Sequence, residues 1–404
     1  MSFPFATVTP NQLSYARRDE RYRRLHEAVE TSYHHPSGLR MVWKYDDVRT
    51  VLEATVPGLS AANSLDPLVG YRRIAATPSA IPPFVQHLFP PPAKATANLT
   101  DKVLHAKVWS TMAGADGHFT IPPGQRDTRA ATMSAHFHAA LNAADTTSEL
   151  DVTALSITYA ARITAEAVGL PPEAWPNVAV WSGAQSGLLG RHLRGRELGT
   201  AVQALGWLFT VSARTVADGS GLAHRLREAD IPRRVAVSAM ANSLAAGVHT
   251  VSGTIQQGLE RLLTPGDRRW WDMLAEQSQA GRVALKLLQL DPGLVAWKRK
   301  AERPITLPSG ATLSTGPVLA LFAAANRDPA AFPDLWSMDG KGKLPLTFGF
   351  GRHICPGKQL AALAIEVFLR ELHALAPHAE LVPTSTRRPA DLLFSGADIA
   401  IASS

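Results

Sequence analysis

The sequence has one cysteine, Cys355, and this scarcity limits the chemistry open to the chain. A disulfide within the chain needs two thiols, and zinc or iron–sulfur sites built on several cysteines need more, so both are excluded. No stretch approaches 18 uninterrupted apolar residues, the length at which a membrane-spanning helix is expected. The first residues lack the basic and apolar regions of a secretory signal. We therefore expect a cytoplasmic protein with no membrane partner.

Charge is also sparse. Charged residues make up 19% of the chain, below the roughly 25% of an average globular protein. Lys and Arg number 41 against 34 Asp and Glu, but the densest basic clusters, at 298–300 and 191–196, are too short for a nucleic-acid-binding arm. The G-x-S-x-G nucleophile elbow and the glycine-rich phosphate loop are both missing. Nucleic-acid binding, serine hydrolysis and P-loop chemistry are not expected.

Helical spacing of apolar residues dominates the pattern. Helices are predicted over 155–168, 235–263, 283–290 and 359–375, and a further one of about fifteen residues after Ile121-Pro122-Pro123-Gly124. Strand signals are confined to a hairpin over 305–313 and to a strand entering a helix over 318–325. The proline-rich stretch 78–92 is expected to be an irregular loop. With 404 residues and no shift in composition, we expect one domain over residues 1–404, mainly α with a small β region.

The most informative stretch is the glycine-rich loop Phe348-Gly349-Phe350-Gly351-Arg352-His353-Ile354-Cys355-Pro356-Gly357, which opens a long apolar helix. Glycine allows unusual backbone angles and the close approach of a large flat ligand. Backbone N–H groups and the N-terminus of the following helix favour a thiolate over a thiol. Such a sulfur suits a reactive nucleophile or an axial ligand of iron, and the alternative is a buried, inert cysteine. The glycine spacing favours the reactive or ligating sulfur.

This loop resembles the haem-binding loop of the cytochrome P-450 superfamily, F-G-x-G-x-x-x-C-x-G. It matches at every fixed position: Phe348, Gly349, Gly351, Cys355 and Gly357. The resemblance implies a single-domain fold in which a triangular prism of helices surrounds a b-type haem. It also implies that Cys355 is the thiolate ligand of the iron, that Phe348 packs near the sulfur and that His353 reaches a haem propionate.

The segment Ala246-Gly247-Val248-His249-Thr250 looks like the oxygen-binding groove of the family's central helix. The resemblance implies that Ala246 and Gly247 make room for dioxygen and that Thr250 serves proton delivery. His249 stands where the family usually has an acid, so it either relays protons in the acid's place or is a histidine hydrogen-bonded in the helix groove. A threonine in mid-helix otherwise bonds back to its own helix.

Further haem and substrate contacts follow from the same resemblance. Pro122-Pro123-Gly124-Gln125 and Arg129 look like the start of the family's haem-edge helix, with Gln125 in place of a histidine. Arg299 matches a second arginine that binds propionate. Val295 and Trp297 fall where the family lines its substrate pocket. The alternatives are solvated surface charges for the arginines and plain core for Val295 and Trp297.

The sequence departs from the family at its E-x-x-R pair, where Lys286 and Gln289 stand in place of Glu and Arg. The third partner, an arginine in the segment before the cysteine loop, is also missing. Losing one member of a buried ion network costs roughly 3–5 kcal/mol, whereas losing all of them together can be nearly neutral. The joint absence predicts a replacement network around Lys286 and Gln289.

The resemblance implies a monooxygenase of the soluble bacterial type, which uses dioxygen and takes electrons from NAD(P)H through a ferredoxin reductase and a ferredoxin. Basic residues surround the cysteine loop and suit an acidic redox partner: Lys341, Lys343, Arg352 and Lys358. The expected substrate is a small molecule or modified peptide of secondary metabolism. The basic cluster at 191–196 hints at a substrate carboxylate, with hydroxylation or oxidative decarboxylation as outcomes.

Two alternatives to this function stay open. A peroxide-using or phenol-coupling haem enzyme is suggested by the missing acid before Thr250. A catalytically silent haem-binding partner protein is suggested by the missing ion triad.

Overall fold

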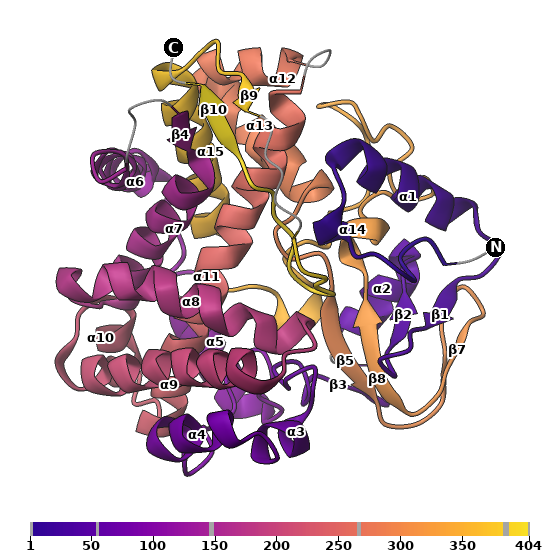
Figure 1. Cartoon of the computed structure of the whole chain (residues 1–404), viewed down its shortest axis with the longest axis vertical. Helices are drawn as coiled ribbons and strands as arrows, with labels where there is room; N and C mark the ends of the chain where they lie inside the picture. The colour runs from indigo at the N-terminus through magenta and orange to yellow at the C-terminus, as the bar shows by residue number, and fades with distance from the viewer. Residues whose placement is uncertain (1–2, 54–55, 145–148, 265–267, 383–387, 403–404) are drawn as a thin grey trace.

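Helices make up most of the molecule (Figure 1). The structure, a computed structural model, describes residues 3–53, 56–144, 149–264, 268–382 and 388–402. The helices are α1 (Tyr15–Glu27), α2 (Tyr45–Leu52), α3 (Tyr71–Ala75), α4 (Ile81–Leu88), α5 (Lys102–Ala113), α6 (Arg126–Leu141), α7 (Val152–Val168), α8 (Trp175–Gly190), α9 (Gly195–Asp218), α10 (Gly221–Glu228), α11 (Arg233–Leu262), α12 (Arg269–Asp272), α13 (Gln277–Leu290), α14 (Phe322–Ala325) and α15 (Lys358–Leu375). Single 3-10 turns lie at η1 (Pro10–Gln12), η2 (Pro78–Ala80), η3 (Pro123–Gln125), η4 (Pro172–Ala174), η5 (Met273–Ala275) and η6 (Gly351–His353).

The strands form small sheets. They are β1 (Ser32–His34), β2 (Arg40–Val42), β3 (Leu59–Ser60), β4 (Glu149–Asp151), β5 (Trp297–Ala301), β6 (Ile305–Thr306), β7 (Thr312–Leu313), β8 (Gly316–Ala320), β9 (Leu381–Val382) and β10 (Ala400–Ala402). The largest sheet has the order β1-β2-β8-β5-β3, in which only β2 and β8 pair in parallel. The order of the second sheet is β4-β10-β9, and β6 pairs with β7. The expected fold class, mainly α with a small β region, is confirmed.

The long helix α11 runs through the helical part of the molecule, and the largest sheet lies beside it with α1 and α2 (Figure 1). Helices α7, α8 and α9 pack against α11, while α13 and α15 pack against each other. One hydrophobic cluster fills the helical part and two smaller ones fill the sheet region. Leu335 packs on both the helical cluster and one of the sheet clusters. The extent of the domain, 1–404, stays a prediction.

Most of the helices and strands predicted from local sequence patterns are present in the structure. Helices α7, α11, α13 and α15 lie where apolar spacing predicted them, and the hairpin β6–β7 pairs Ile305 with Leu313. The Asp151 side chain caps α7 by accepting from the Ala154 N–H at 2.9 Å, and Gly169 ends it with a left-handed φ of 94°. Among the described residues, none of the helices is both long and apolar enough to cross a bilayer.

The expectation of an irregular loop over 78–92 is wrong, because this stretch contains η2 and the helix α4. Pro82 and Pro83 stand in the first turn of α4, where a proline costs nothing because the N–H groups there have no helical partner. The proline cluster marks the beginning of a helix here, and only the residues after α4 continue as irregular chain.

A buried cluster of charged side chains joins α1, α11, α13 and the segment after α14. Its members are three arginines and three carboxylates: Arg18, Arg261, Arg327, Asp19, Glu260 and Asp291. Asp291, which directly follows α13, accepts from Arg261 Nε at 2.5 Å and is 2% exposed. Burial would raise the pKa of Asp291, but Arg261, Arg18 and Arg327 hold it below its usual value. Because the charges balance, the cluster ties these elements together without leaving an unpaired ion.

Replacing Asp291 by Asn is expected to destabilise the fold by ~3–5 kcal/mol, because it leaves buried arginines without their shared counterion. Since the pKa of Asp291 is lowered in the folded state, its contribution is fully present above the unfolded value of about 3.9 and is lost as the pH falls through the folded value. Urea unfolding at pH 7 measures the full contribution, and unfolding at about pH 2, below the unfolded value of about 3.9, measures its loss. The exposed Asp116→Asn is the matched control, and equal stability of the two variants would contradict the prediction.

Candidate functional site

The loop that carries Cys355 is folded back on itself before α15. The Cys355 N–H donates to the Phe348 carbonyl at 2.8 Å, and the Gly349 N–H donates to the Leu346 carbonyl at 2.8 Å. Gly349 and Gly351 have φ angles of 77° and 69°, which side chains other than glycine rarely adopt. Gly349 and Gly351, two of the three fixed glycines of the sequence pattern, are therefore required by the backbone, and the folded loop presents Cys355 just before the N-terminus of α15.

The Cys355 thiol is an unpromising free nucleophile. Burial raises its pKa, and the Gly357 N–H and the Lys358 ammonium lower it by less. A buried thiol stays protonated at neutral pH unless a cation takes the proton's place, and a metal ion does so directly. The environment of the sulfur therefore suits an iron ligand better than a reactive cysteine.

Arg299 on β5 carries a buried positive charge without a counterion. It is 1% exposed, and its guanidinium donates to Ser64 Oγ and to the Lys298 carbonyl, each at 3.0 Å. Its Nε has no partner, and no ion pair joins it to a carboxylate of the described residues. Burial lowers the pKa of Arg299 to about 10. A buried cation of this kind calls for an anionic partner from outside the chain.

Two buried imidazoles lie beside the cysteine loop. His353 Nδ1 donates to the Thr96 carbonyl at 2.9 Å, and its ring meets that of His105 edge-on at 4.5 Å between centroids. Burial and the nearby Arg299 lower the pKa of His353 to about 3, and burial and Arg352 lower that of His105 to about 4. Neither nitrogen of His105 lies within hydrogen-bond geometry of a described partner. The free N–H of neutral His105 and the unpaired arginine together fit the carboxylates of a propionate-bearing cofactor, whereas neutral His353 already donates its one N–H to Thr96.

The helix that contacts the cysteine loop is α5, whereas Gln125 and Arg129 lie elsewhere among the described residues, and their role at a haem edge stays a prediction. Trp109 Nε1 on α5 donates to the Ile354 carbonyl at 3.1 Å, one residue before Cys355. Gln125 is exposed, and Arg129 on α6 lies near Glu166 and His118. His105 and Trp109 stand four residues apart on one face of α5, and this spacing is the sequence signal for the helix that contacts the loop.

The α11 segment around Ala246 is open on one side. Ala246 is exposed, although Leu244 and Val248 beside it are fully buried. Thr250 Oγ1 donates to the Ala246 carbonyl at 2.7 Å, so its proton is engaged within the helix and its lone pairs remain free to accept. Ala246 and Thr250 thus line the accessible side of the helix, as expected for a groove.

Gly247 has a role in the packing of α7 on α11. A Cβ on this residue would lie 2.6 Å from the side chain of Thr164 on α7. Its small size therefore permits the close packing of α7 on α11, and Ala246 is the residue on the open side. The role of Gly247 toward dioxygen stays a prediction.

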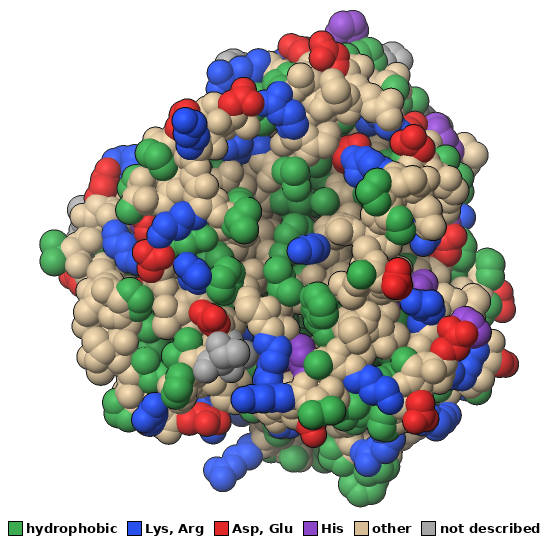
Figure 2. Space-filling model, turned by 180° about the vertical axis from the view of Figure 1, so that it is seen from behind, with side chains coloured by type: hydrophobic (Ala, Val, Ile, Leu, Met, Phe, Trp, Pro, Cys, Tyr) green, Lys and Arg blue, Asp and Glu red, His purple; other side chains and the backbone are tan. Residues whose placement is uncertain are grey.

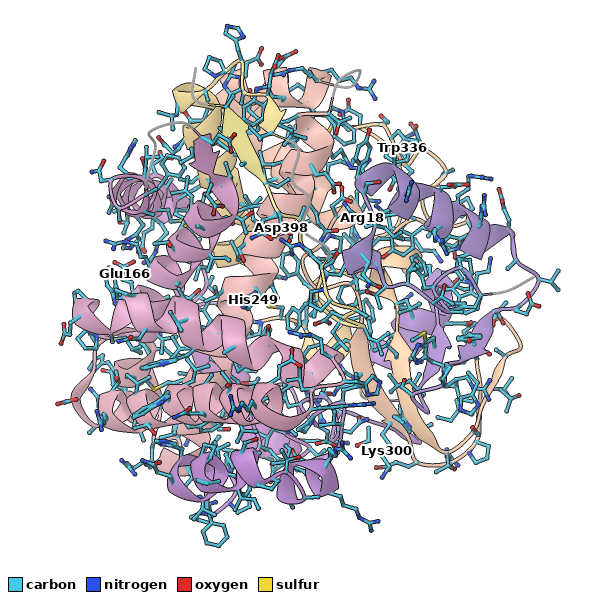
Figure 3. The ribbon with its side chains drawn as sticks, viewed as in Figure 1. Arg18, Glu166, His249, Lys300, Trp336 and Asp398 are labelled. Carbon is cyan, nitrogen blue, oxygen red and sulfur yellow. The ribbon has the colours of Figure 1, made fainter. Side chains whose placement is uncertain are left out.

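His249 turns toward α8, near the centre of the molecule (Figure 3). Its Nε2 is buried without a partner and lies 3.9 Å from where a Cβ of Gly183 would be. Its ring meets that of Phe394 at 6.1 Å. Burial lowers the pKa of His249 to about 4, so the ring is neutral at pH 7. It can therefore pass a proton on only by accepting one at one nitrogen and releasing one at the other.

The two residues expected to line a substrate pocket are placed differently. Val295 is 3% exposed and packs in a sheet cluster, where it borders a cavity of about 20 Å³ together with Phe5 and Leu321. It is therefore core, which was the alternative interpretation. Trp297 on β5 is half-buried and pairs with Ala320 of β8. Its role toward a substrate stays a prediction.

A network of amide and hydroxyl groups, with the ammonium of Lys286 at its edge and no carboxylate, stands where the family has its ion triad. The Asn326 side chain donates to the Gln289 carbonyl at 3.2 Å and to Thr347 Oγ1 at 2.8 Å, and it accepts from the Leu346 N–H at 2.6 Å. Gln289 Nε2 donates back to the Asn326 carbonyl at 3.2 Å. Lys286 Nζ donates to Gln289 Oε1 at 3.2 Å and to a backbone carbonyl at 3.0 Å. These contacts join α13 to the segment that enters the cysteine loop, so the predicted replacement network exists.

Comparison with curated proteins gives relatives over part of the chain. Cytochrome P450 BJ-3 from Bradyrhizobium diazoefficiens is 28% identical over 171 residues, which are 39% of this chain and 40% of that protein. Cytochrome P450 144 from Mycobacterium tuberculosis is 28% identical over 222 residues, 52% of this chain and 51% of that protein. The matches thus span about half or less of these relatives. No protein-family model matches the chain.

Solved structures match the whole chain. Cytochrome P450 CREJ in complex with (4-ethylphenyl) dihydrogen phosphate covers 99% of this chain and 100% of its own, with a TM-score of 0.81 and 21% identity. The P450 haem domain from Tepidiphilus thermophilus covers 98% and 96%, with a TM-score of 0.81 and 18% identity. At such identities the likeness shows the fold. The sequence relatives and the cysteine loop agree with the fold: the chain is similar to members of the cytochrome P450 superfamily. The cofactor of that superfamily is haem b with a thiolate ligand, and Cys355, Arg299 and His105 are the residues that fit it.

The first prediction for this site concerns the Cys355 ligand. The dithionite-reduced carbonyl complex of the purified protein is expected to show the red-shifted Soret band of a thiolate ligand. The reason is that Cys355 occupies the iron-ligand position of the loop pattern. Cys355→Ser should lose that band. Full haem loading with a histidine-type carbonyl spectrum would contradict the assignment.

A second prediction concerns the network around Asn326. The double variant Lys286→Glu/Gln289→Arg restores the family's pair but lacks the third partner, and it removes the amide contact to Asn326. We expect it to be ~1–4 kcal/mol less stable than the wild type, with haem retained. Thermal unfolding of the holoprotein measures this, with the exposed Gln277→Arg on the same helix as control. A rise in the unfolding temperature of the double variant would show that the network is no replacement.

Proposed function

We propose that this chain is a haem-thiolate monooxygenase that oxidises a small organic substrate in secondary metabolism. The observation that carries the proposal is the unpaired Arg299 beside His353, two residues from Cys355, since this set fits a propionate-bearing haem. The haem would supply the redox chemistry that activates dioxygen. The chain's own residues bind it, orient it and deliver protons.

Thr250 is the proposed proton-delivering group. Its Oγ1 donates to the Ala246 carbonyl and keeps its lone pairs free, so it could accept a proton from a bound water and, by rotation of the hydroxyl, pass a proton toward the open side of α11. The exposed Ala246 leaves that side free for a small molecule. His249 is the proposed source behind Thr250, because its neutral ring has one nitrogen without a partner.

The substrate side of the proposal favours an uncharged group over a carboxylate. Arg191 pairs with Glu197, and His192, Arg194 and Arg196 are exposed on the surface. The aromatic ring of Phe394 lies near His249 instead. This supports an apolar or aromatic substrate and weakens the case for oxidative decarboxylation.

The proposed electron donor is a ferredoxin with an acidic surface. Of the basic residues around the cysteine loop, Lys341 and Lys358 are exposed, while Lys343 pairs with Asp46 at 2.8 Å. An acidic partner would meet Lys341 and Lys358 first, and such contacts speed association more than they tighten it.

A peroxide-using enzyme is the second candidate, favoured by the neutral state of His249. Two-electron reduction of dioxygen consumes two protons before the O–O bond opens, and a neutral, buried imidazole is a slow source for them. Hydrogen peroxide brings those protons and electrons with it, so a peroxide-driven reaction needs only a proton moved between its two oxygens.

The test is turnover of a spectroscopically identified ligand with ferredoxin, reductase and NADPH, compared with turnover driven by peroxide. Thr250→Ala is expected to lower the product formed per NADPH by about tenfold or more, since general acid–base groups contribute about 10²–10⁴-fold and water can bypass part of the loss. His249→Ala should lower it less and leave ligand binding unchanged. The exposed Asn142→Ala is the control. Equal coupling in all variants would remove the proposed relay, and turnover with peroxide alone would favour the second candidate.

A further inference from the structure

The helix α4 presents an apolar stripe to solvent. Ile81, Val85 and Phe89 stand four residues apart along α4 and the residue after it, and they are 44%, 58% and 67% exposed. Tyr71 on the neighbouring α3 is 58% exposed. The opposite side of α4 packs on α9, with Leu88 buried and His87 against Trp207. The exposed stripe is therefore not the side of α4 that packs in the hydrophobic core, because the opposite side of the helix already does so.

Arginines surround this stripe without partners of their own. Ser79 Oγ donates to the Gly195 carbonyl at 2.8 Å and brings the start of α9 beside α3 and α4. Four exposed arginines lie on these segments and form no ion pair among the described residues: Arg72, Arg73, Arg194 and Arg196. In Figure 2, hydrophobic side chains crowd the lower edge of the molecule, the edge formed by α3 and α4 in Figure 1, with Lys and Arg next to them.

The arrangement disfavours protein partners. A second copy of this chain across a two-fold axis would set arginine against arginine around the stripe. A specific protein interface buries about 800 Å² of each partner, more than a few side chains along an eight-residue helix present. Apolar side chains flanked by arginines on a protruding edge match instead the pattern of segments that lie in the surface of a membrane.

We propose that the α3–α4 edge, defined by Tyr71, Ile81, Val85, Phe89 and the four arginines, docks reversibly on an anionic lipid surface. The apolar side chains would enter the boundary between headgroups and acyl chains, and the arginines would meet lipid phosphates. The sequence-based expectation of no membrane partner rested on the lack of a spanning segment and does not touch such peripheral contact. The inference does not depend on the proposed enzymatic function.

The experiment is flotation of the full-length holoprotein with vesicles of phosphatidylcholine alone or with a third of phosphatidylglycerol. Arg72→Ala/Arg73→Ala is expected to weaken binding to the anionic vesicles about 30-fold, since each arginine near such a surface contributes about fivefold. Val85→Ser/Phe89→Ser should weaken it about tenfold or more. Raising the salt should release the wild type, because the contact is partly electrostatic.

Arg17→Ala and Val29→Ser are the matched controls, since both residues are exposed and belong to α1 and the chain just after it. Unchanged binding in these controls and loss in the two α3–α4 variants support the proposal. A wild type that stays unbound to anionic vesicles at low salt overturns it. So does binding that the α3–α4 variants leave unchanged, or a dimer seen by light scattering that Val85→Ser/Phe89→Ser dissolves. Carbonyl spectra of all variants confirm that they are folded and haem-loaded.

Discussion

The shared burial of Asp291 with Arg261 holds the two halves of the site in register. Arg261 belongs to α11, the helix of Ala246 and Thr250, and Asp291 directly follows α13. From α13 the connection continues through Gln289 and Asn326 to the chain that enters the cysteine loop. The position of α11 relative to the Cys355 loop is thus fixed first by the Arg261–Asp291 ion pair and then by the hydrogen bonds between Gln289 and Asn326. Arg18 of α1, labelled in Figure 3, also pairs with Asp291, at 3.4 Å.

Two buried arginines show how the chain treats charge inside this fold. Arg261 forms ion pairs with Asp291 and Asp19, so its charge stabilises the fold. Arg299 is equally buried but has hydroxyl and carbonyl partners only, so its charge remains available. The hydrogen-bond network at Asn326 is consistent with this contrast. An ion triad there would place further charges near the cysteine loop without adding to cofactor binding. At the place of the family's E-x-x-R pair, this chain therefore joins α13 to the cysteine loop with amide hydrogen bonds in place of ion pairs.

What the sequence revealed depended on whether the signal was local. The cysteine loop was predictable because two glycines with left-handed angles and one thiol leave a pattern within ten residues, and the fold class followed from apolar spacing in α7, α11 and α15. The helix α5, which contacts the loop, was not predictable as its partner. His105 and Trp109 are identified only by their contacts with His353 and Ile354, about 250 residues away in sequence. The packing role of Gly247 was not predictable for the same reason, since its neighbour Thr164 comes from another helix.

A chain of helix contacts connects the α3–α4 edge to the site. Helix α4 packs on α9, α9 packs on α8, and α8 packs on α11, where His249 lies against Gly183. Close packing makes such a stack stiff, so a displacement of α4 cannot be absorbed in a single loop and must be shared among the three interfaces. Gly206 of α9 narrows that freedom further, because a Cβ there would lie 2.6 Å from His87 of α4. Contact at the edge would therefore act on α8 and α9 as one body, and α8 is the helix that lies against the buried nitrogen of His249.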